Sequence, residues 1–171
     1  VYTVEAYLRC GTRITTATDA SPYEIGAVLE EHNAITSYFA DRISSTDRQA
    51  LALGAEPSST DQQALEAFAI LVALREWAPR WKDKRVRLSV RIDNLAALSM
   101  LTRMQPHSNA LGLVARELAL DVAASVYSPD EAIHIPGLAN KAADAPSRVH
   151  EPSMSSSTPS LPPYMPAHMF H

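Results

Sequence analysis

The chain has 171 residues, of which 46% are hydrophobic and 20% are charged, and its formal net charge is −4. These values are typical of one globular domain with a sizeable core, and the net acidity argues against a protein that coats nucleic acid through general basicity. No apolar run is long enough for a membrane span, and the single cysteine, Cys10, excludes an internal disulfide and favours an intracellular location, with nucleus and cytoplasmic particle both left open.

The two ends of the chain differ in character from its middle. Residues 1–11 begin without a Met or an apolar leader, which favours a linker from an upstream region of a longer protein. Residues 149–171 are rich in Ser, Pro, Met and Thr and lack any hydrophobic period, which predicts a disordered tail. The folded domain is therefore expected over residues 12–148.

The first part of this domain predicts three short strands. Turn residues separate apolar and Thr-rich runs at residues 13–19, 25–31 and 34–41. His32 and Asn33 alone separate the second run from the third, which is the spacing of a tight hairpin. We expect an antiparallel meander.

A long helix is predicted next. The intervening residues 43–61 are polar and turn-like, with room for one helical turn that Gly54 would end. Several N-cap candidates occur at 58–61, and the helix should run to about Trp77, because Pro79 stops it. Its apolar positions recur near every 3.6 residues and predict one buried face. They are Leu65, Phe68, Ala69, Val72 and Trp77.

The remaining elements alternate between strand and helix. Residues 86–92 alternate apolar and polar side chains, as in a strand with one buried face. Residues 94–104 and 108–125 have helical patterns, 132–135 is a short strand, and a last helix begins at 140–145. The order βββ-α-β-α-α-β-α indicates a mixed α/β layer fold.

Four acids occur where strands and helices can direct them to one point. Asp19 closes the first strand and Asp93 the fourth, Glu66 borders the apolar face of the long helix, and Asp144 lies early in the last helix. Such carboxylates repel one another unless cations neutralise them, and oxygen ligands without Cys or clustered His favour Mg²⁺ or Mn²⁺ over Zn²⁺. Each acid alone also has a structural interpretation: Asp19 as a turn residue, Asp93 as an N-cap, and the other two as ordinary helix acids.

Five segments form a set with a recognisable order: TDAS at 18–21, IGAVL at 25–29, EAFAILVAL at 66–74 before Trp77, VRIDN at 90–94, and HIPGLANKAADAPSR at 134–148. Together they resemble the ribonuclease H domains of retroelements, and the last of them is similar to the segment that ends this domain in gypsy-type and related LTR or tyrosine-recombinase retrotransposons. The resemblance implies a ribonuclease H-like mixed five-stranded sheet, three strands antiparallel and then two parallel, flanked by helices.

The resemblance also implies an activity. Asp19, Glu66, Asp93 and Asp144 correspond to the four catalytic, metal-binding acids of that family, with Asp19 as the shared ligand of two Mg²⁺ ions, for which Mn²⁺ can substitute. The implied reaction cleaves the RNA strand of RNA–DNA hybrids to a 5′-phosphate and a 3′-hydroxyl. The implied partner, besides the hybrid, is a reverse transcriptase upstream in the same polyprotein.

Two departures from the family pattern leave an alternative open. Many relatives carry a His in the loop before the last acid, whereas residues 137–140 have none and His134 occupies a strand position. Pro146 follows Asp144 closely and is able to shorten the last helix and loosen that ligand. The alternative is a catalytically silent module that packs against a reverse transcriptase. A transposase or integrase core is disfavoured by the helical Glu66.

Basic residues suggest a contact surface for nucleic acid. They are Arg80, Lys82, Lys84, Arg87 and Arg91. They are interpreted either as a track for phosphates or as a solvated surface. A hybrid would be recognised by duplex shape and 2′-hydroxyls rather than by base edges.

Overall fold

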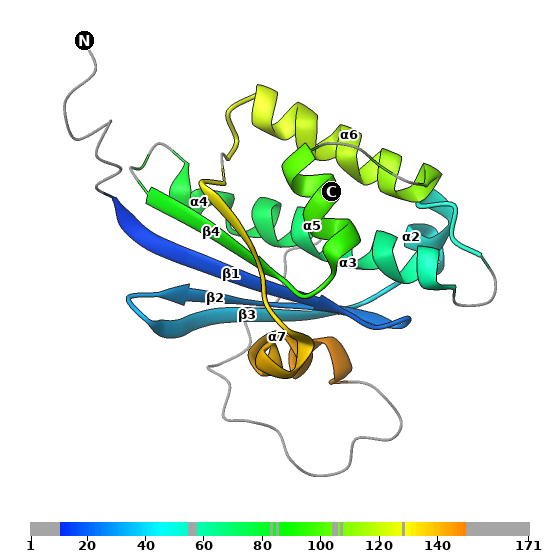
Figure 1. Ribbon diagram of the computed structural model, residues 1–171, viewed down its shortest axis with the longest axis horizontal. Coiled ribbons are helices and arrows are strands. Elements are labelled where there is room, and N and C mark those ends of the chain that lie inside the picture. Colours follow the sequence, from blue (N-terminus) through cyan, green and yellow to red (C-terminus); the bar gives the residue numbers. More distant parts are fainter. Residues whose placement is uncertain are drawn as a thin grey trace.

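The computed structural model describes residues 11–54, 58–82, 84, 86–103, 106, 108–127 and 129–149 (Figure 1). The predicted linker and tail fall almost entirely outside these residues. No helix within the described ranges combines the length and the apolar character needed to cross a membrane.

One five-stranded sheet forms the centre of the fold, in the order β3-β2-β1-β4-β5. Strand β2 pairs antiparallel with both β1 and β3, whereas β4 runs parallel to β1 and β5 parallel to β4. The predicted mixed sheet of three antiparallel and two parallel strands is confirmed. The strands are β1 (Thr12–Ala20), β2 (Glu24–Glu31), β3 (Ala34–Arg42), β4 (Val86–Ile92) and β5 (Glu131–His134).

The hairpin between β2 and β3 turns at the predicted pair. His32 and Asn33 have φ values of 54° and 64°. Positive φ at both central residues is the requirement of a type I′ turn, whose twist matches that of the flanking strands. The two-residue spacing therefore located the turn correctly.

Helices cover the two faces of the sheet unequally. Helices α3, α5 and α6 lie on one face, and the short α7 lies on the other (Figure 1). The helices are α2 (Ser45–Ala50), α3 (Ser59–Glu76), α4 (Ala78–Trp81), α5 (Leu95–Arg103), α6 (Asn109–Ala123) and α7 (Lys141–Asp144), with 3-10 turns η1 (Gly137–Ala139) and η2 (Pro146–Arg148).

The long helix α3 is buried on more than the one predicted face. Every residue from Leu65 to Leu74 except Phe68 is buried. The cause is its place between the sheet and the helices α5 and α6, so that two sides face apolar neighbours. Periodicity identified the helix but underestimated its burial, because a helix packed on several sides loses the polar face on which the period depends.

The short helix ends earlier than predicted, whereas the long helix ends close to the predicted position. Helix α2 begins with a capping box in which Ser44 and Asp47 bind each other's backbone N–H groups, and the chain turns at Ala52, with φ of 52°, before it reaches Gly54. The long helix ends at Glu76, and Pro79 lies in the first turn of α4, where a missing N–H costs nothing.

The C-terminal segment packs on the face of the sheet opposite to α3. Asn140 Nδ2 donates a hydrogen bond of 2.9 Å to the backbone oxygen of Thr18. Ala143 packs against Ala17 and Val28 in a small second core. These contacts place α7 and η2 beside the end of β1.

Candidate metal centre

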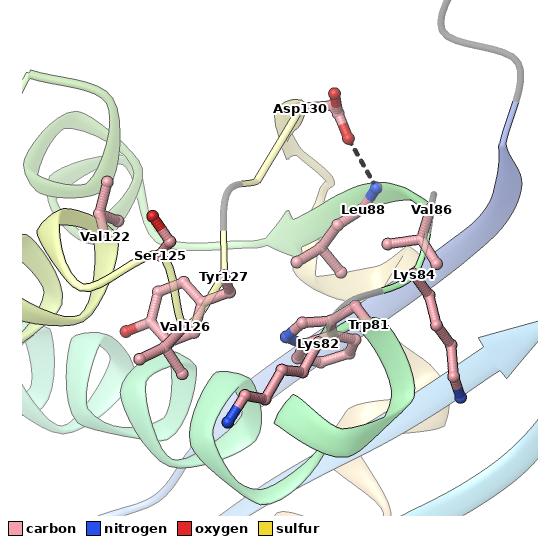
Figure 2. A pocket seen from close by; sticks show the side chains of 10 residues that line it. All are labelled: Trp81, Lys82, Lys84, Val86, Leu88, Val122, Ser125, Val126, Tyr127 and Asp130. Carbon is pink, nitrogen blue, oxygen red and sulfur yellow. Dashed lines mark hydrogen bonds between the residues drawn. The ribbon is translucent and has the colours of Figure 1, made fainter. Parts of the chain in front are cut away.

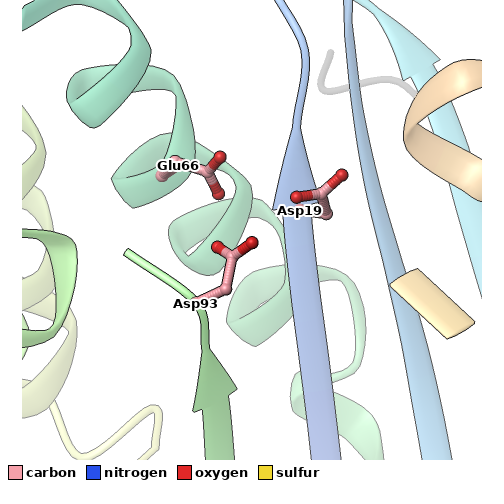
Figure 3. Close-up of side chains that lie close together, drawn as sticks. All are labelled: Asp19, Glu66 and Asp93. Carbon is pink, nitrogen blue, oxygen red and sulfur yellow. The ribbon is translucent and has the colours of Figure 1, made fainter. Parts of the chain in front are cut away.

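Three of the four predicted acids meet at one edge of the sheet (Figure 3). Asp19, Glu66 and Asp93 each place one carboxylate oxygen within 4.8 Å of the others. Asp19 is near the end of β1, Asp93 directly follows β4, and Glu66 comes from α3 above them. Because β1 and β4 are adjacent and parallel, both strands end at the same edge, and this brings together residues far apart in the sequence.

Burial and mutual repulsion perturb all three carboxyl groups. Burial, together with the charges of Asp19 and Asp93, raises the pKa of Glu66 to about 9. Burial also raises the pKa of Asp19 to about 6, with a hydrogen bond from Ser147 acting in the opposite direction. The pKa of Asp93 is raised, mainly by burial. The cluster therefore disfavours simultaneous ionisation unless a positive charge is present.

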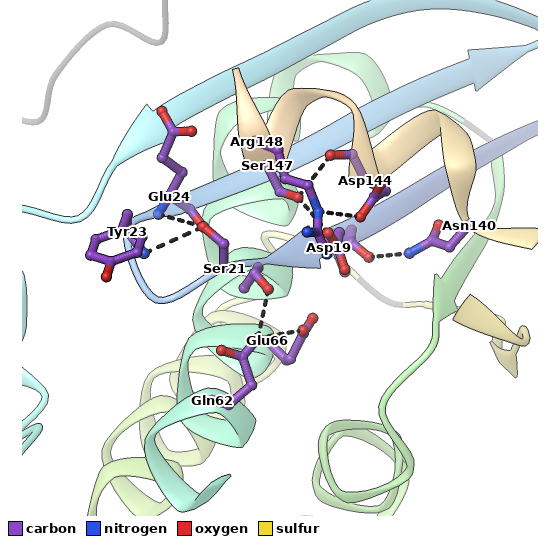
Figure 4. Close-up of polar contacts among 12 residues, drawn as sticks. Asp19, Ser21, Tyr23, Glu24, Gln62, Glu66, Asn140, Asp144, Ser147 and Arg148 are labelled. Carbon is purple, nitrogen blue, oxygen red and sulfur yellow. Dashed lines mark hydrogen bonds and ion pairs between the residues drawn. The ribbon is translucent and has the colours of Figure 1, made fainter. Parts of the chain in front are cut away.

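Glu66 leaves one oxygen available to that positive charge. Gln62 Nε2 donates to Glu66 Oε1 at 3.0 Å and to the backbone oxygen of Ala20 at 2.5 Å, so it ties the carboxylate to β1 (Figure 4). Glu66 Oε2 is buried without a hydrogen-bond partner among the described residues. An orphaned buried carboxylate oxygen beside two further carboxylates fits a hard divalent cation such as Mg²⁺ or Mn²⁺.

The alternative role of Asp93 as an N-cap is taken by its neighbour. Asn94 Oδ1 accepts hydrogen bonds from the N–H groups of Ala96 and Ala97, at 2.9 and 3.1 Å. The Asp93 side chain is therefore not needed to cap α5. His134 occupies a strand position, as predicted, and its Nε2 lies 3.0 Å from the backbone oxygen of Asp93.

Asp144 is near this cluster but is not among the three acids within 4.8 Å. It is the last residue of α7, and its Oδ1 accepts a hydrogen bond of 2.6 Å from Arg148 Nε. Its charge contributes to the raised pKa of Asp19 and of Asp93, so it lies within electrostatic reach. Pro146 opens η2 directly after this point, and α7 is a single turn, as its position in the sequence predicted.

Ser147 belongs to the site although no motif in the sequence indicated it. Its Oγ donates a hydrogen bond to Asp19 Oδ2 and also lies 3.0 Å from the backbone oxygen of Asp144 (Figure 4). Asp19 and Ser147 are 128 positions apart, and no local pattern links them. Only the docking of η2 on the sheet reveals the contact.

The predicted basic residues are largely engaged with acids. The three arginines form ion pairs with glutamates of β2 and β5, and these pairs neutralise charge that a phosphate track would use. They are Arg80 with Glu31 at 3.6 Å, Arg87 with Glu131 at 2.7 Å, and Arg91 with Glu30 at 3.1 Å.

The two lysines of the predicted track lie elsewhere. Lys82 and Lys84, with Trp81 and Tyr127, line a cavity of about 450 Å³ (Figure 2). This cavity borders the beginning of β4, whereas Asp93 follows the end of that strand. The lysines are therefore separated from the acid cluster by the length of β4.

No protein-family model and no curated protein matches the sequence. Solved structures do match the fold. RNase H1 from the halophilic archaeon Halobacterium salinarum NRC-1 aligns with a TM-score of 0.57 at 18% identity over 78% of this chain and 92% of that one. LC11-RNase H1, isolated from compost by a metagenomic approach, gives 0.58 at 17% identity over 80% and 91%. The N-terminal RNase H domain of a Mycobacterium tuberculosis protein, solved as a fusion with maltose-binding protein, gives 0.51 at 15% identity over 77% and 93%. The chain thus has the ribonuclease H fold.

Proposed function

We propose that this chain is a metal-dependent endonuclease that cuts the RNA strand of RNA–DNA hybrids. The observation that carries the proposal is the cluster of Asp19, Glu66 and Asp93, with its orphaned carboxylate oxygen, at the edge of a ribonuclease H fold. The sequence segments that resemble ribonuclease H domains support it, because they contain these same three acids.

The carboxylates of the site would act as ligands for a divalent metal ion. Asp19, Glu66 and Asp93 would hold Mg²⁺, or Mn²⁺ in its place, with Asp19 as the shared ligand of a pair and Asp144 alongside. A bound divalent cation supplies an activated water and stabilises charge on the leaving oxygen. Glu66 must give up its proton to become a ligand, so its high pKa makes binding depend on pH.

A labelled RNA–DNA hybrid tests the proposal. The wild-type chain should cut the RNA strand with Mg²⁺ or Mn²⁺ and should stop when EDTA removes the metal. D93N keeps the shape of the side chain but removes its charge, and it should lower the rate by more than about 100-fold, beyond the effect typical of residues that only support a ligand. E117Q, on α6, removes a charge outside the cluster and should cut like the wild type.

One observation favours a second candidate, a catalytically silent module that packs against a reverse transcriptase. Asp144 is paired with Arg148 and does not join the other three acids. If the folded wild-type chain cuts no hybrid with either metal, the silent module is the better description. Metal-dependent cutting that D93N abolishes contradicts it.

A separate proposal concerns the longer protein to which this domain belongs. We infer that the chain is part of an intracellular retroelement polyprotein and works beside an upstream reverse transcriptase. Support comes from the resemblance at residues 134–148. The coding sequence upstream of Val1 tests this inference, since a Tyr-x-Asp-Asp motif of a polymerase is expected there, and an unrelated domain would contradict it.

A further inference from the structure

The neighbouring acids affect the orientation of the Asp19 carboxylate. It stands near the end of β1 with Glu66 and Asp93 close by, and the negative charge of Asp93 favours any rotamer that turns Asp19 away. A donor on its opposite side would counter this tendency, because a hydrogen bond to one carboxylate oxygen fixes the direction of the other.

Ser147 supplies that donor. Its side chain is fully buried, and its hydroxyl donates to Asp19 Oδ2 (Figure 4). The backbone oxygen of Asp144, 3.0 Å from the same hydroxyl, is a second acceptor for its single proton.

A glycine in β2 makes this approach possible. A Cβ atom built on Gly26 would lie 2.4 Å from the backbone nitrogen of Ser147 and 2.9 Å from Pro146 Cβ. Gly26 pairs directly with Asp19 in the β1–β2 ladder, so η2 is seated over the residue next to the metal ligand. Any larger side chain at position 26 would lift η2 from the sheet.

We propose that Ser147 is a positioning residue that holds the Asp19 carboxylate toward Glu66 and Asp93 for metal binding. This inference rests on the proposed metal-dependent function. Partners that orient a metal ligand through hydrogen bonds contribute to affinity without touching the ion. Ser147 acts on the metal through Asp19, and Gly26 acts through Ser147.

Mn²⁺ binding to the folded full chain tests the inference without any turnover. Calorimetric titration should show that S147A weakens Mn²⁺ binding by about 10-fold to 100-fold. In hybrid cleavage, S147A should need correspondingly more Mn²⁺ for its half-maximal rate but approach the wild-type rate at saturation. G26A, which displaces the hydroxyl without removing it, should weaken binding in the same direction.

The matched control is S108A. Ser108 caps α6, where its side chain accepts from the N–H of Leu111, so its removal costs stability away from the acids. S108A should keep the wild-type dissociation constant for Mn²⁺. Equal weakening in S108A and S147A would mean a general structural effect and would overturn the positioning role.

The outcomes separate the two proposals. If the wild-type chain binds Mn²⁺ and cuts the hybrid but S147A binds as tightly, the role of Ser147 is wrong and the metal centre stands. If the wild-type chain binds no Mn²⁺, the metal centre is wrong and the role of Ser147 is wrong with it.

Discussion

Glu66 is held in the protonated form at neutral pH by its surroundings. The folded chain raises its pKa from an ordinary 4.5 to about 9, chiefly through burial. Asp19 follows the same pattern, from 3.8 to about 6. The site therefore stores unfavourable electrostatic free energy that a divalent cation would relieve.

The stability of the metal-free chain should consequently fall as pH rises. Between the ordinary and the raised pKa of Glu66, the folded state binds more protons than the unfolded state. The stabilisation that protonated Glu66 gives the folded state is therefore fully present below about pH 4.5 and is lost as pH rises to about 9. Urea unfolding in EDTA from about pH 5 to about pH 9 measures this trend. E66Q should flatten it, and a wild-type stability that does not change with pH would contradict the buried cluster.

At the residue scale, the sequence predicted the acids better than their arrangement. Asp19, Glu66 and Asp93 were identified because each falls in a segment of recognisable pattern. The ion pair of Asp144 with Arg148 and the hydroxyl of Ser147 on Asp19 were missed. Both depend on how a short turn after Pro146 docks on a distant strand, and no periodicity carries that information.

At the element scale, the seating of η2 on β2 depends on one missing side chain. G26A should lower the free energy of unfolding by about 1–3 kcal/mol, because a Cβ at this position overlaps the backbone of Ser147. Urea unfolding measures the change.

Gly112 provides the comparison for that substitution. It lies inside α6, and among the described residues a Cβ there would meet only Pro106, at 3.8 Å, within ordinary contact distance. G112A should therefore stabilise the chain by about 0.5–1 kcal/mol, through the higher helix propensity of alanine. If both substitutions shift stability in the same direction, the close approach at Gly26 is not the cause.

Helices α3 and α6 are joined by a charged network next to the loop that follows α6. Arg75 binds Asp121 through Nε at 2.6 Å and Glu117 through Nη2 at 2.9 Å, and the Tyr127 hydroxyl donates to Asp121 at 2.8 Å. These bonds connect the end of α3 with the last turns of α6.

Removing one hydroxyl from this network should measurably destabilise the fold. Y127F deletes a buried hydrogen bond to a carboxylate and should cost about 1.5–3 kcal/mol in urea unfolding. Tyr23, which is 60% exposed against 4% for Tyr127, supplies the control Y23F, for which no loss is expected. Equal stabilities of Y127F and Y23F would show that the network contributes nothing.

Elements with a strong local signal were predicted, and those without one were not. The three antiparallel strands, the hairpin at His32 and Asn33, and the long helix α3 all follow from alternation, spacing and caps. Helix α4 was missed because Pro79 was taken as a stop rather than as a first-turn residue. The parallel pairing of β4 and β5 came from the family resemblance, since no local pattern specifies the neighbours of these two strands.

At the scale of the whole molecule, the charge distribution limits the affinity for a nucleic acid. The net charge is −4, and the strand arginines are paired with glutamates. We expect the isolated chain to bind an RNA–DNA hybrid weakly and with strong dependence on salt. Such a chain would gain from a neighbouring domain that holds the substrate.

Releasing paired arginines should strengthen this binding. Glu131 contacts Arg87 at 2.7 Å and Arg13 at 3.9 Å, so E131Q frees both cations and should tighten hybrid binding several-fold, with a steeper salt dependence. Fluorescence anisotropy at two salt concentrations measures the affinities. E117Q makes the same change in net charge on α6 and should have a smaller effect, so equal gains would argue against a phosphate track on the strands.

The contact between Ser147 and Asp19 also sets an order of events during synthesis. Asp19 leaves the ribosome early, whereas Ser147 is translated 128 residues later. A nascent chain that already contains β1, α3 and β4 still lacks the turn that orients its first acid. The hydrogen bond that orients Asp19 therefore forms only when the last part of the domain has emerged, so the proposed metal centre reaches its final geometry late in synthesis.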